Sequence, residues 1–301
     1  MKIALLSVGT LVWGCGETDP PVHGGYTGGD SSSADGAGGD FVSGDVRGDP
    51  GGGDTFMGDH HIGGDSTSPI DCDVTICLGG ALFRNTGANP TYVQPLCELL
   101  PGIVYDTTDN QYSFFMYSNS AGALAALIDA LDTNNDGFVD ESDDRCRVNI
   151  VGYSWGGVNA AHKLAPDFMG HANVSVERAI VDNLLIMAPY APSVSPIHVP
   201  SDVRRFREYR HSSTPASDCS IGVPLGPYLG IPPECPTGAD CIDYDYALEP
   251  DSLFVGLVDD WYGDEVGHCT IVDVAAPAVM YELGVTQTVP ALPPTVPVDV
   301  Y

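Results

Sequence analysis

A serine framed by glycines at a strand-to-helix turn restricts the fold of this chain more than any other feature of the sequence. Residues 148–151 are expected to form a buried strand, and residues 156–164 a helix. The apolar residues recur at the spacing of a strand in the first segment and at that of a helix in the second. The turn between them is Gly152-Tyr153-Ser154-Trp155-Gly156. A Gly-x-Ser-x-Gly sequence in this context lifts the serine hydroxyl above the edge of a sheet, on a strained backbone. We therefore expect Ser154 to be a nucleophile; the alternative is a glycine-rich turn with an incidental serine.

The chain from residue 71 onward alternates short apolar runs with helical patterns. This alternation is typical of α/β proteins with a mostly parallel sheet. Strands are expected at residues 74–78, 103–105, 148–151, 184–187, 206–210 and 253–258. Helices are expected at residues 121–131, 156–164 and 270–283, and the Pro-rich tail after Gly284 is expected to be irregular. One domain, residues 71–301, accounts for all of these elements.

Residues 1–15 have the pattern of a bacterial secretory signal. Lys2 precedes the apolar stretch of residues 3–13, and the small Gly14 precedes Cys15. Residues 12–15, Val-Trp-Gly-Cys, resemble a lipobox, which implies lipidation of Cys15; simple cleavage is the alternative. Either outcome predicts an exported protein, attached to the outer membrane or cell surface, or secreted. No apolar run reaches the about 18 residues that a membrane-spanning helix needs, so membrane attachment is expected through a lipid anchor alone.

Glycine and aspartate dominate residues 16–70. This segment holds 16 of the 36 glycines, and ten acidic residues against one arginine. Such a composition cannot bury enough apolar surface to offset its conformational entropy, so we expect a disordered linker that holds the domain off a surface. The whole chain carries a formal charge of −30. That charge excludes nucleic acid as a partner, because phosphate binding needs a basic face.

A second motif, residues 132–143, follows the pattern of an EF-hand calcium loop. Acidic or amide side chains occupy its first, third, fifth, ninth and twelfth positions, and Gly137 occupies the sixth, where the loop turns sharply. The expected calcium ligands are Asp132, Asn134, Asp136, the carbonyl of Phe138, Asp140 and Asp143. The ion is expected to be structural and to brace the helix that leads to the nucleophile strand; the alternative is a turn without metal.

The turn around Ser154 and its flanking pattern resemble the α/β-hydrolase superfamily, in particular small secreted lipase- and cutinase-like serine esterases. The resemblance covers roughly residues 71–285. It implies a three-layer α/β-hydrolase fold with a mostly parallel central sheet, in a minimal form that lacks the N-terminal hairpin. It also implies a serine, an acid and a histidine in that chain order, with an oxyanion loop after an early strand.

The resemblance assigns the remaining site residues by their order in the chain. His268, directly before the last expected helix, takes the place of the general base, ahead of His171, His198 and His211. Asp218 takes the place of the acid, with Asp240, which lies between Cys235 and Cys241, and Asp202 as alternatives. The oxyanion donors are expected to be the amides of Trp155 and Ala81.

The cysteines are consistent with export. Eight remain if Cys15 is lipidated, an even number that predicts disulfides outside the cytoplasm. If Asp218 and His268 meet above Ser154, the adjacent Cys219 and Cys269 also meet, and a disulfide between them would clip the acid to the base. A bond between Cys235 and Cys241 would instead favour Asp240 as the acid.

These features together predict an exported, monomeric serine hydrolase that cleaves carboxylic esters of small molecules or lipids through an acyl-enzyme. The alternatives are a peptidase or amidase, and a noncatalytic calcium-braced binding protein on the same fold.

Overall fold

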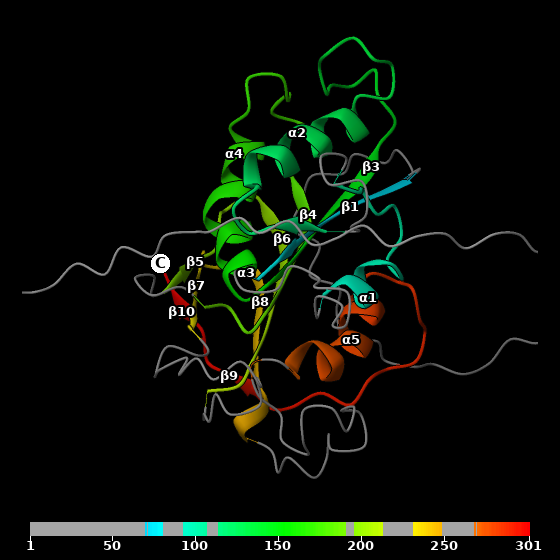
Figure 1. The fold of residues 1–301 in the computed structure, drawn as a ribbon. Helices are drawn as coiled ribbons and strands as arrows, with labels where there is room; N and C mark the ends of the chain where they lie inside the picture. The colour runs from blue at the N-terminus through cyan, green and yellow to red at the C-terminus, as the bar shows by residue number, and fades with distance from the viewer. Residues whose placement is uncertain are drawn as a thin grey trace, which may run out of the picture. The chain divides into compact units, whose positions relative to one another are not determined.

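A mostly parallel β-sheet runs through the part of the chain that the structure describes (Figure 1). The computed structural model describes residues 70, 72–80, 93–106, 114–190, 196–212, 231–248, 268 and 270–301. All of them belong to one unit of the chain, Gly64–Tyr301. The expected signal, Cys15 and most of the Gly/Asp-rich segment lie outside the described residues.

The main sheet has seven strands in the order β2-β1-β3-β4-β6-β8-β9 among the described residues. Neighbouring strands are parallel, except that β9 runs antiparallel to β8. Their bounds are β1 Cys72–Gly79, β2 Phe115–Met116, β3 Cys146–Tyr153, β4 Val181–Met187, β6 Val203–Arg210, β8 Asp240–Asp245 and β9 Thr295–Val296. A smaller parallel sheet joins β10 (Asp299–Val300), β7 (Pro233–Cys235) and β5 (Ile197–His198). The predicted mostly parallel α/β architecture is therefore confirmed.

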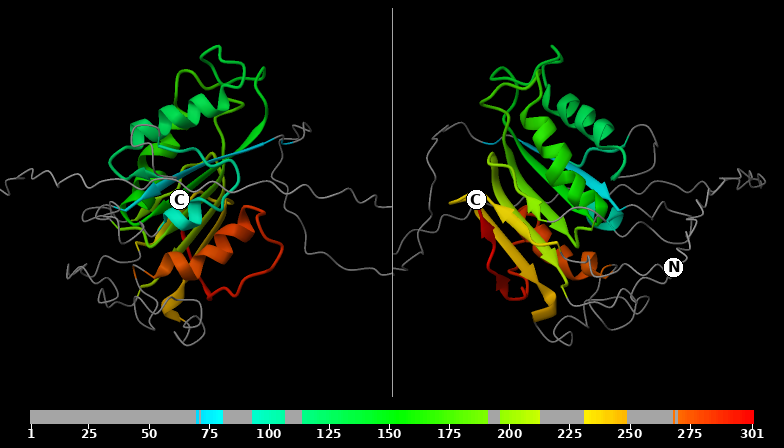
Figure 2. Two further views of the ribbon diagram at one scale, coloured as in Figure 1. Left: turned by 45° about the vertical axis from the view of Figure 1, so that its right-hand side comes forward. Right: turned by 90° about the vertical axis from the view of Figure 1, so that its left-hand side faces the viewer.

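Helices cover both faces of the main sheet, which explains why its strands read as almost continuous apolar runs. On one face, Ile76, Ile150 and Leu184 pack under α2 (Ser120–Leu131), α3 (Trp155–Asn159), the π-helical turn η1 (Ala160–Leu164) and α4 (Ala165–Met169). On the other, Cys77, Val151 and Leu185 pack under α1 (Gln94–Cys97) and α5 (Ile271–Glu282). Figures 1 and 2 show α2 and α4 on the opposite side of the strands from α5. A short 3₁₀ turn, η3 (Tyr246–Leu248), follows β8.

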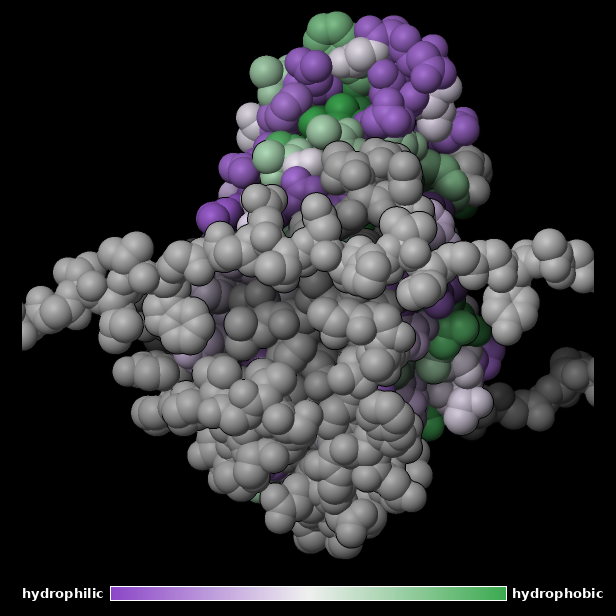
Figure 3. Space-filling model, viewed as in Figure 1, coloured by the Kyte–Doolittle hydropathy of each residue, from purple (hydrophilic) through white to green (hydrophobic). Residues whose placement is uncertain are grey.

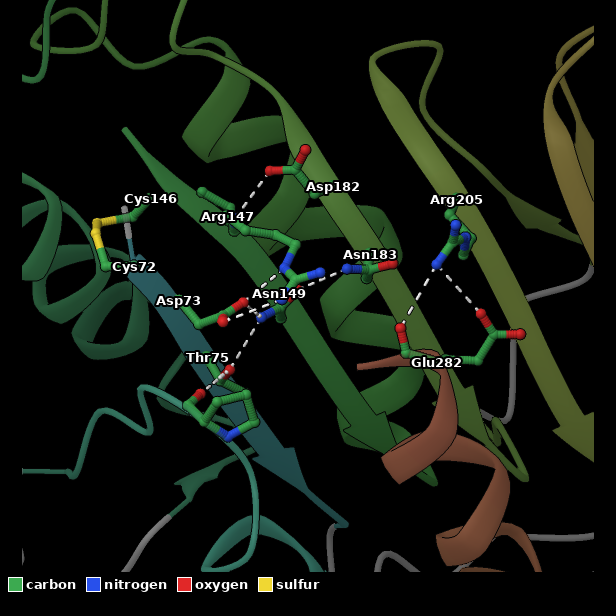
Figure 4. A network of polar contacts seen from close by, with 12 residues as sticks. Cys72, Asp73, Thr75, Cys146, Arg147, Asn149, Asp182, Asn183, Arg205 and Glu282 are labelled. Carbon is green, nitrogen blue, oxygen red and sulfur yellow. Dashed lines mark hydrogen bonds and ion pairs between the residues drawn. A yellow bond between two sulfur atoms is a disulfide. The ribbon is translucent and has the colours of Figure 1, made fainter. Parts of the chain in front are cut away.

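A row of buried polar side chains crosses β1, β3 and β4 near their amino ends (Figure 4). Asn149 donates to the Thr75 hydroxyl at 3.2 Å and accepts from the amide of Asn183 at 2.7 Å. The Thr75 hydroxyl in turn donates to the carbonyl of Pro101 at 2.6 Å. A one-residue slip of any of the three strands would move its polar side chain to the other face and leave these groups unpaired, so the row specifies the strand register.

Three sequence predictions about strands need correction. Residues 103–105 form only an isolated bridge, between Ile103 and Thr75, and the outer neighbour of β1 is β2 instead. Residues 240–245, where no strand was predicted, form β8. The tail after Gly284 contributes the short strands β9 and β10. The strand predicted at residues 253–258 lies outside the described residues.

Three disulfides among the described residues confirm that the chain uses cysteines in pairs. Cys72–Cys146 joins β1 to β3, Cys77–Cys97 joins β1 to α1, and Cys235–Cys241 joins β7 to β8. Their Cα atoms lie 4.4, 6.4 and 6.5 Å apart, within the usual range of about 4.4–6.8 Å. Cys219 and Cys269 lie outside the described residues, so the bond between them stays a prediction.

Candidate active site

The adjacent parallel strands β1 and β3 lie where the order in which strands are added to the sheet reverses. From β1 the chain goes to β2 on one side, and then to β3 on the other side of β1. In open α/β sheets, ligands bind beyond the carboxyl ends of the strands at such a switch point. Gly80 follows β1 and Ser154 follows β3, so both lie at this position.

Ser154 forms a strained turn between β3 and α3. Its φ of 56° and ψ of −127° lie in a region of backbone conformation that residues other than glycine rarely adopt. The turn is held by a bond from the Ser154 amide to the Met187 carbonyl at 2.9 Å, and by one from the Gly157 amide to the Ser154 carbonyl at 3.0 Å. Such backbone strain persists only where the surroundings impose it, and it is concentrated at functional sites. The strand, turn and helix therefore take the arrangement that the sequence pattern predicts.

Three glycines allow the backbones to approach one another around Ser154. A Cβ atom on Gly152 would lie 2.6 Å from the Cα atom of Gly157, and one on Gly156 would lie 2.4 Å from the carbonyl oxygen of Leu78. These positions admit no side chain, because real Cβ contacts are not so short. A Cβ atom on Gly80 would lie 3.0 Å from that of Ser154. The chain leaving β1 therefore passes directly beside the candidate nucleophile.

The structure brings His268 to Ser154, although 114 positions separate them in the sequence. The His268 Nε2 atom lies 2.9 Å from the Ser154 Oγ atom, and the two residues are 2% and 4% exposed. Burial lowers the pKa of His268 to about 4, because it disfavours the imidazolium form. The imidazole is therefore neutral at neutral pH and can accept the serine proton.

Two tyrosines enclose His268. The Tyr153 hydroxyl donates to the His268 main-chain carbonyl at 3.0 Å, and the two rings lie 5.4 Å apart. The Tyr190 ring meets the imidazole edge-on at 6.2 Å. Sequence analysis missed both residues, since only the fold brings them to the histidine, although the position of Tyr153 directly before Ser154 was a signal.

The second ring nitrogen of His268, Nδ1, is buried and has no hydrogen-bond partner among the described residues. In a serine triad, a carboxylate accepts from this nitrogen and fixes the tautomer that leaves the other nitrogen basic. Asp218, the predicted acid, lies outside the described residues and stays a prediction.

The two alternative acids lie at the amino ends of the parallel strands, whereas Ser154 lies at their carboxyl ends. Asp240 is the first residue of β8, and Asp202 directly precedes β6, whereas Ser154 follows the last residue of β3. Asp240 accepts two bonds from Arg207, at 2.8 and 3.0 Å. Burial alone would raise the pKa of Asp240, but the bonds and the charge of Arg207 bring it below its usual value. The Cys235–Cys241 disulfide forms, but the structure brings neither Asp240 nor Asp202 beside His268.

The expected oxyanion donors lie around the same turn. Trp155 is the first residue of α3, where amides have no acceptor within the helix and can bind an oxyanion. Its ring packs against that of Tyr117 at 5.0 Å. Ala81 lies outside the described residues, but its neighbour Gly80 lies beside Ser154.

The remaining histidines of the described chain make local contacts elsewhere. The amide of His198 donates to the Nε2 atom of His162 at 3.1 Å, and the Nδ1 atom of His198 lies 2.8 Å from Glu234. The Nδ1 atom of His171 accepts from the Asn173 amide at 3.2 Å. His211 is buried directly after β6.

The predicted calcium loop has the turn that its sequence requires, but its carboxylates bind amides. Gly137 has a φ of 89°. Asp132 accepts from the Gly137 amide at 2.8 Å, and Asp143 accepts from the Thr133 amide at 2.8 Å. Figure 3 shows mainly hydrophilic residues at this end of the domain, beyond α2.

Calcium binding stays a prediction from the sequence pattern. Within the described ranges, no group of three or more His, Cys, Asp or Glu side chains lies close enough to hold a metal ion. The loop offers the oxygen donors that calcium prefers, yet they do not converge in this arrangement. Binding would require the side-chain oxygens of Asp132 and its neighbours to come together around the ion.

Comparison with known proteins identifies no relative: no protein-family model, no curated protein and no solved structure matches the chain. No helix in the described part of the chain is both long and apolar enough to cross a membrane.

Proposed function

We propose that this chain is an exported serine hydrolase that cleaves carboxylic esters, with Ser154 as nucleophile and His268 as general base. One observation carries the proposal: the 2.9 Å approach of the His268 Nε2 atom to the Ser154 Oγ atom. Ser154 lies in a strained strand-to-helix turn, at the position in the sheet where ligands bind.

The geometry supports an acyl-transfer mechanism. The Ser154 Oγ atom attacks the ester carbonyl carbon while His268 Nε2 takes the hydroxyl proton. The negative charge on the carbonyl oxygen is stabilised by the amides of Trp155 and Ala81. Collapse of the intermediate breaks the ester bond, and His268 returns the proton to the departing alcohol. Water then attacks the acyl-enzyme by the same route, releasing the acid and restoring Ser154.

An acid at the Nδ1 atom of His268 completes this mechanism, and we propose Asp218 for that role. The atom is buried and unpartnered among the described residues, so a carboxylate there would satisfy it and stabilise the imidazolium formed during the reaction. Asp218 follows β6 in the chain, where the resemblance to the α/β-hydrolase superfamily leads us to expect the acid.

The rival functions share parts of this site. A peptidase or amidase would use the same serine and histidine, so it differs in the bond that is cleaved. A noncatalytic binding protein would keep the fold but has no need of a strained serine bonded to a buried, neutral imidazole. The strain at Ser154, which costs about 1–3 kcal/mol in such positions, favours catalysis.

A substrate panel tests the reaction class. The purified domain is assayed against matched pairs of ester and anilide that share one acyl group, at short and long acyl lengths. We expect hydrolysis of the esters, and a loss of at least about a thousandfold in the Ser154→Ala variant, because triad members act as a unit. Cleavage of anilides alone would establish the amidase alternative. Equal activity in the Ser154→Ala variant would refute the assignment.

Export and anchoring form a separate part of the proposal, which rests on residues 1–15. We propose that Cys15 becomes the lipidated first residue of the mature protein and holds the domain at a membrane through the Gly/Asp-rich linker. Mass spectrometry of the mature N-terminus is expected to show a diacylglycerol on Cys15. An unmodified mature N-terminus would establish simple secretion instead.

A further inference from the structure

We propose that Tyr153 is a positioning residue for the base: its hydroxyl ties the main chain of His268 to the strand that carries the nucleophile. This proposal rests on the proposed serine hydrolase function. It makes the residue next to the nucleophile in the chain the one that holds the base.

The contacts of Tyr153 connect the two partners directly. It is the last residue of β3, and its own peptide bond leads to Ser154. Its hydroxyl donates to the His268 carbonyl at 3.0 Å, and its ring lies 5.4 Å from the imidazole. The residue is 1% exposed, so it does not reach a substrate.

The base depends on this contact because of where it lies in the chain. His268 precedes α5, whose apolar residues are buried against the sheet. Its imidazole bonds to Ser154 through Nε2, while its Nδ1 atom has no partner among the described residues. Within the described part of the chain, the bond from Tyr153 is the one that fixes the main chain of His268.

The physical properties of the contact suit a positioning role. Strand pairing with Met187 in β4 fixes the backbone of Tyr153, and an aromatic ring has few rotatable bonds. A hydrogen bond shielded from water is stronger than an exposed one. A displacement of about 1 Å in a catalytic group can cost about a hundredfold in rate, so a rigid link between base and nucleophile has a direct catalytic effect.

A purely structural role would give a different result from a positioning role. If the hydroxyl only stabilised the fold, its removal would lower the melting temperature and leave the catalysis of the folded enzyme unchanged. If it positions the base, its removal lowers kcat and leaves KM unchanged. It also admits water to the imidazole, so the pKa of His268, which burial holds low, rises. The acid limb of the rate profile then moves to higher pH.

The chain offers a matched control in Tyr209. This residue lies on the same face of the sheet, one strand beyond Met187, which pairs with both tyrosines. It is fully buried, and its hydroxyl has no hydrogen-bond partner among the described residues. Tyr209→Phe therefore removes a buried tyrosine hydroxyl from the same layer without touching His268.

The experiment compares the parent, Tyr153→Phe and Tyr209→Phe in kcat, KM and pH–rate profile on an activated p-nitrophenyl ester, below the melting temperature of each. We expect kcat to fall roughly ten- to hundredfold in Tyr153→Phe, with KM unchanged and the acid limb shifted upward. Tyr209→Phe should match the parent. A third variant, Tyr153→para-aminophenylalanine, keeps a donor at the same place and is expected to restore most of kcat; it also serves if Tyr153→Phe fails to fold.

Three outcomes would overturn the inference. An active parent with unchanged kcat and pH profile in Tyr153→Phe would refute the positioning role and leave the proposed function intact. A folded but inactive para-aminophenylalanine variant would show that the donor is not what matters. A parent that neither hydrolyses the ester nor reacts with a fluorophosphonate at Ser154 would refute the proposed function, and the positioning role with it.

Discussion

Replacing Ser154 by glycine should stabilise the protein relative to alanine at the same position, while both variants lose activity. Ser154 has a φ of 56° and a ψ of −127°, a conformation that glycine adopts without a steric cost. Alanine removes the hydroxyl but keeps the Cβ atom and therefore the strain. Both variants lose the hydrogen bond to His268, so that loss cancels in the comparison.

The expected difference follows from two opposing effects. Relief of backbone strain contributes about 1–3 kcal/mol, and the greater entropy of glycine in the unfolded chain removes about 0.5–1 kcal/mol. The glycine variant should therefore exceed the alanine variant by up to about 2.5 kcal/mol in its free energy of unfolding. Equilibrium urea unfolding measures this difference. The melting temperatures should differ in the same direction, since about 1 kcal/mol corresponds to about 2–4 °C in a domain of this size.

A matched pair at Ser120 controls for the general effect of glycine. Ser120 is the first residue of α2, and its φ is not among the positive values found in the described residues. There glycine should be less stable than alanine, by up to about 1 kcal/mol. The reasoning fails if glycine is no more stable than alanine at position 154, because Ser154 would then carry no strain that the fold imposes.

Three further predictions concern pH, metal and the acid. The pKa of His268 falls to about 4 on burial, below its value of about 6.5 in the unfolded chain, so the unfolded state binds more protons in between. The free energy of unfolding should therefore fall as the pH drops from about 6.5 to about 4. Urea unfolding at each pH should show a smaller fall in a His268→Ala variant than in the parent. Calcium should raise the melting temperature over that in a chelator, by binding only the native state, and Asp132→Ala should abolish the response; superimposable melts in the parent would show a turn without metal. Asp218→Ala should lower kcat at least about a thousandfold if it is the acid, whereas Asp240→Ala should leave kcat unchanged and lower stability, because it removes two bonds to the buried Arg207; the reverse pattern would return Asp240 to the site.

The strands that the sequence predicts well are those buried on both faces. Residues of β1, β3 and β4 such as Ile76, Ile150 and Leu184 contact neighbouring strands and helices alone, so local hydrophobicity is enough to reveal them. The turn at Ser154 was predictable for a similar reason, since its glycines are required by contacts within the motif and with the adjacent strand.

The six-residue strand β8, which the sequence does not predict, depends on charge pairing with β6. The acids of β8 are unfavourable in an isolated strand, but Asp243 pairs with Arg210 of β6 at 2.8 Å, and Asp240 pairs with Arg207. Each strand therefore neutralises the other, and neither sequence shows this alone. The two-residue strands β2 and β9 are too short to produce a periodic signal.

The site was predictable to the extent that chain order determines it. The order of the motifs indicated His268, and the structure places its Nε2 atom beside Ser154. Chain order could not exclude Asp240. Only the direction of β8 shows that its first residue, Asp240, lies at the opposite end of the strands from Ser154. The contact of Tyr153 with the main chain of His268 depends on the placement of a loop 115 residues away, which no local pattern encodes.

Labelling with a fluorophosphonate tests the central claim most directly. The reagent reacts with a serine that a neighbouring base has activated, and peptide mapping identifies the modified residue. We predict stoichiometric labelling of Ser154 in the parent, none in Ser154→Ala and strongly slowed labelling in a folded His268→Ala variant. Failure to label a folded parent, or labelling at another serine, would contradict the assignment of Ser154 and His268 as a catalytic pair.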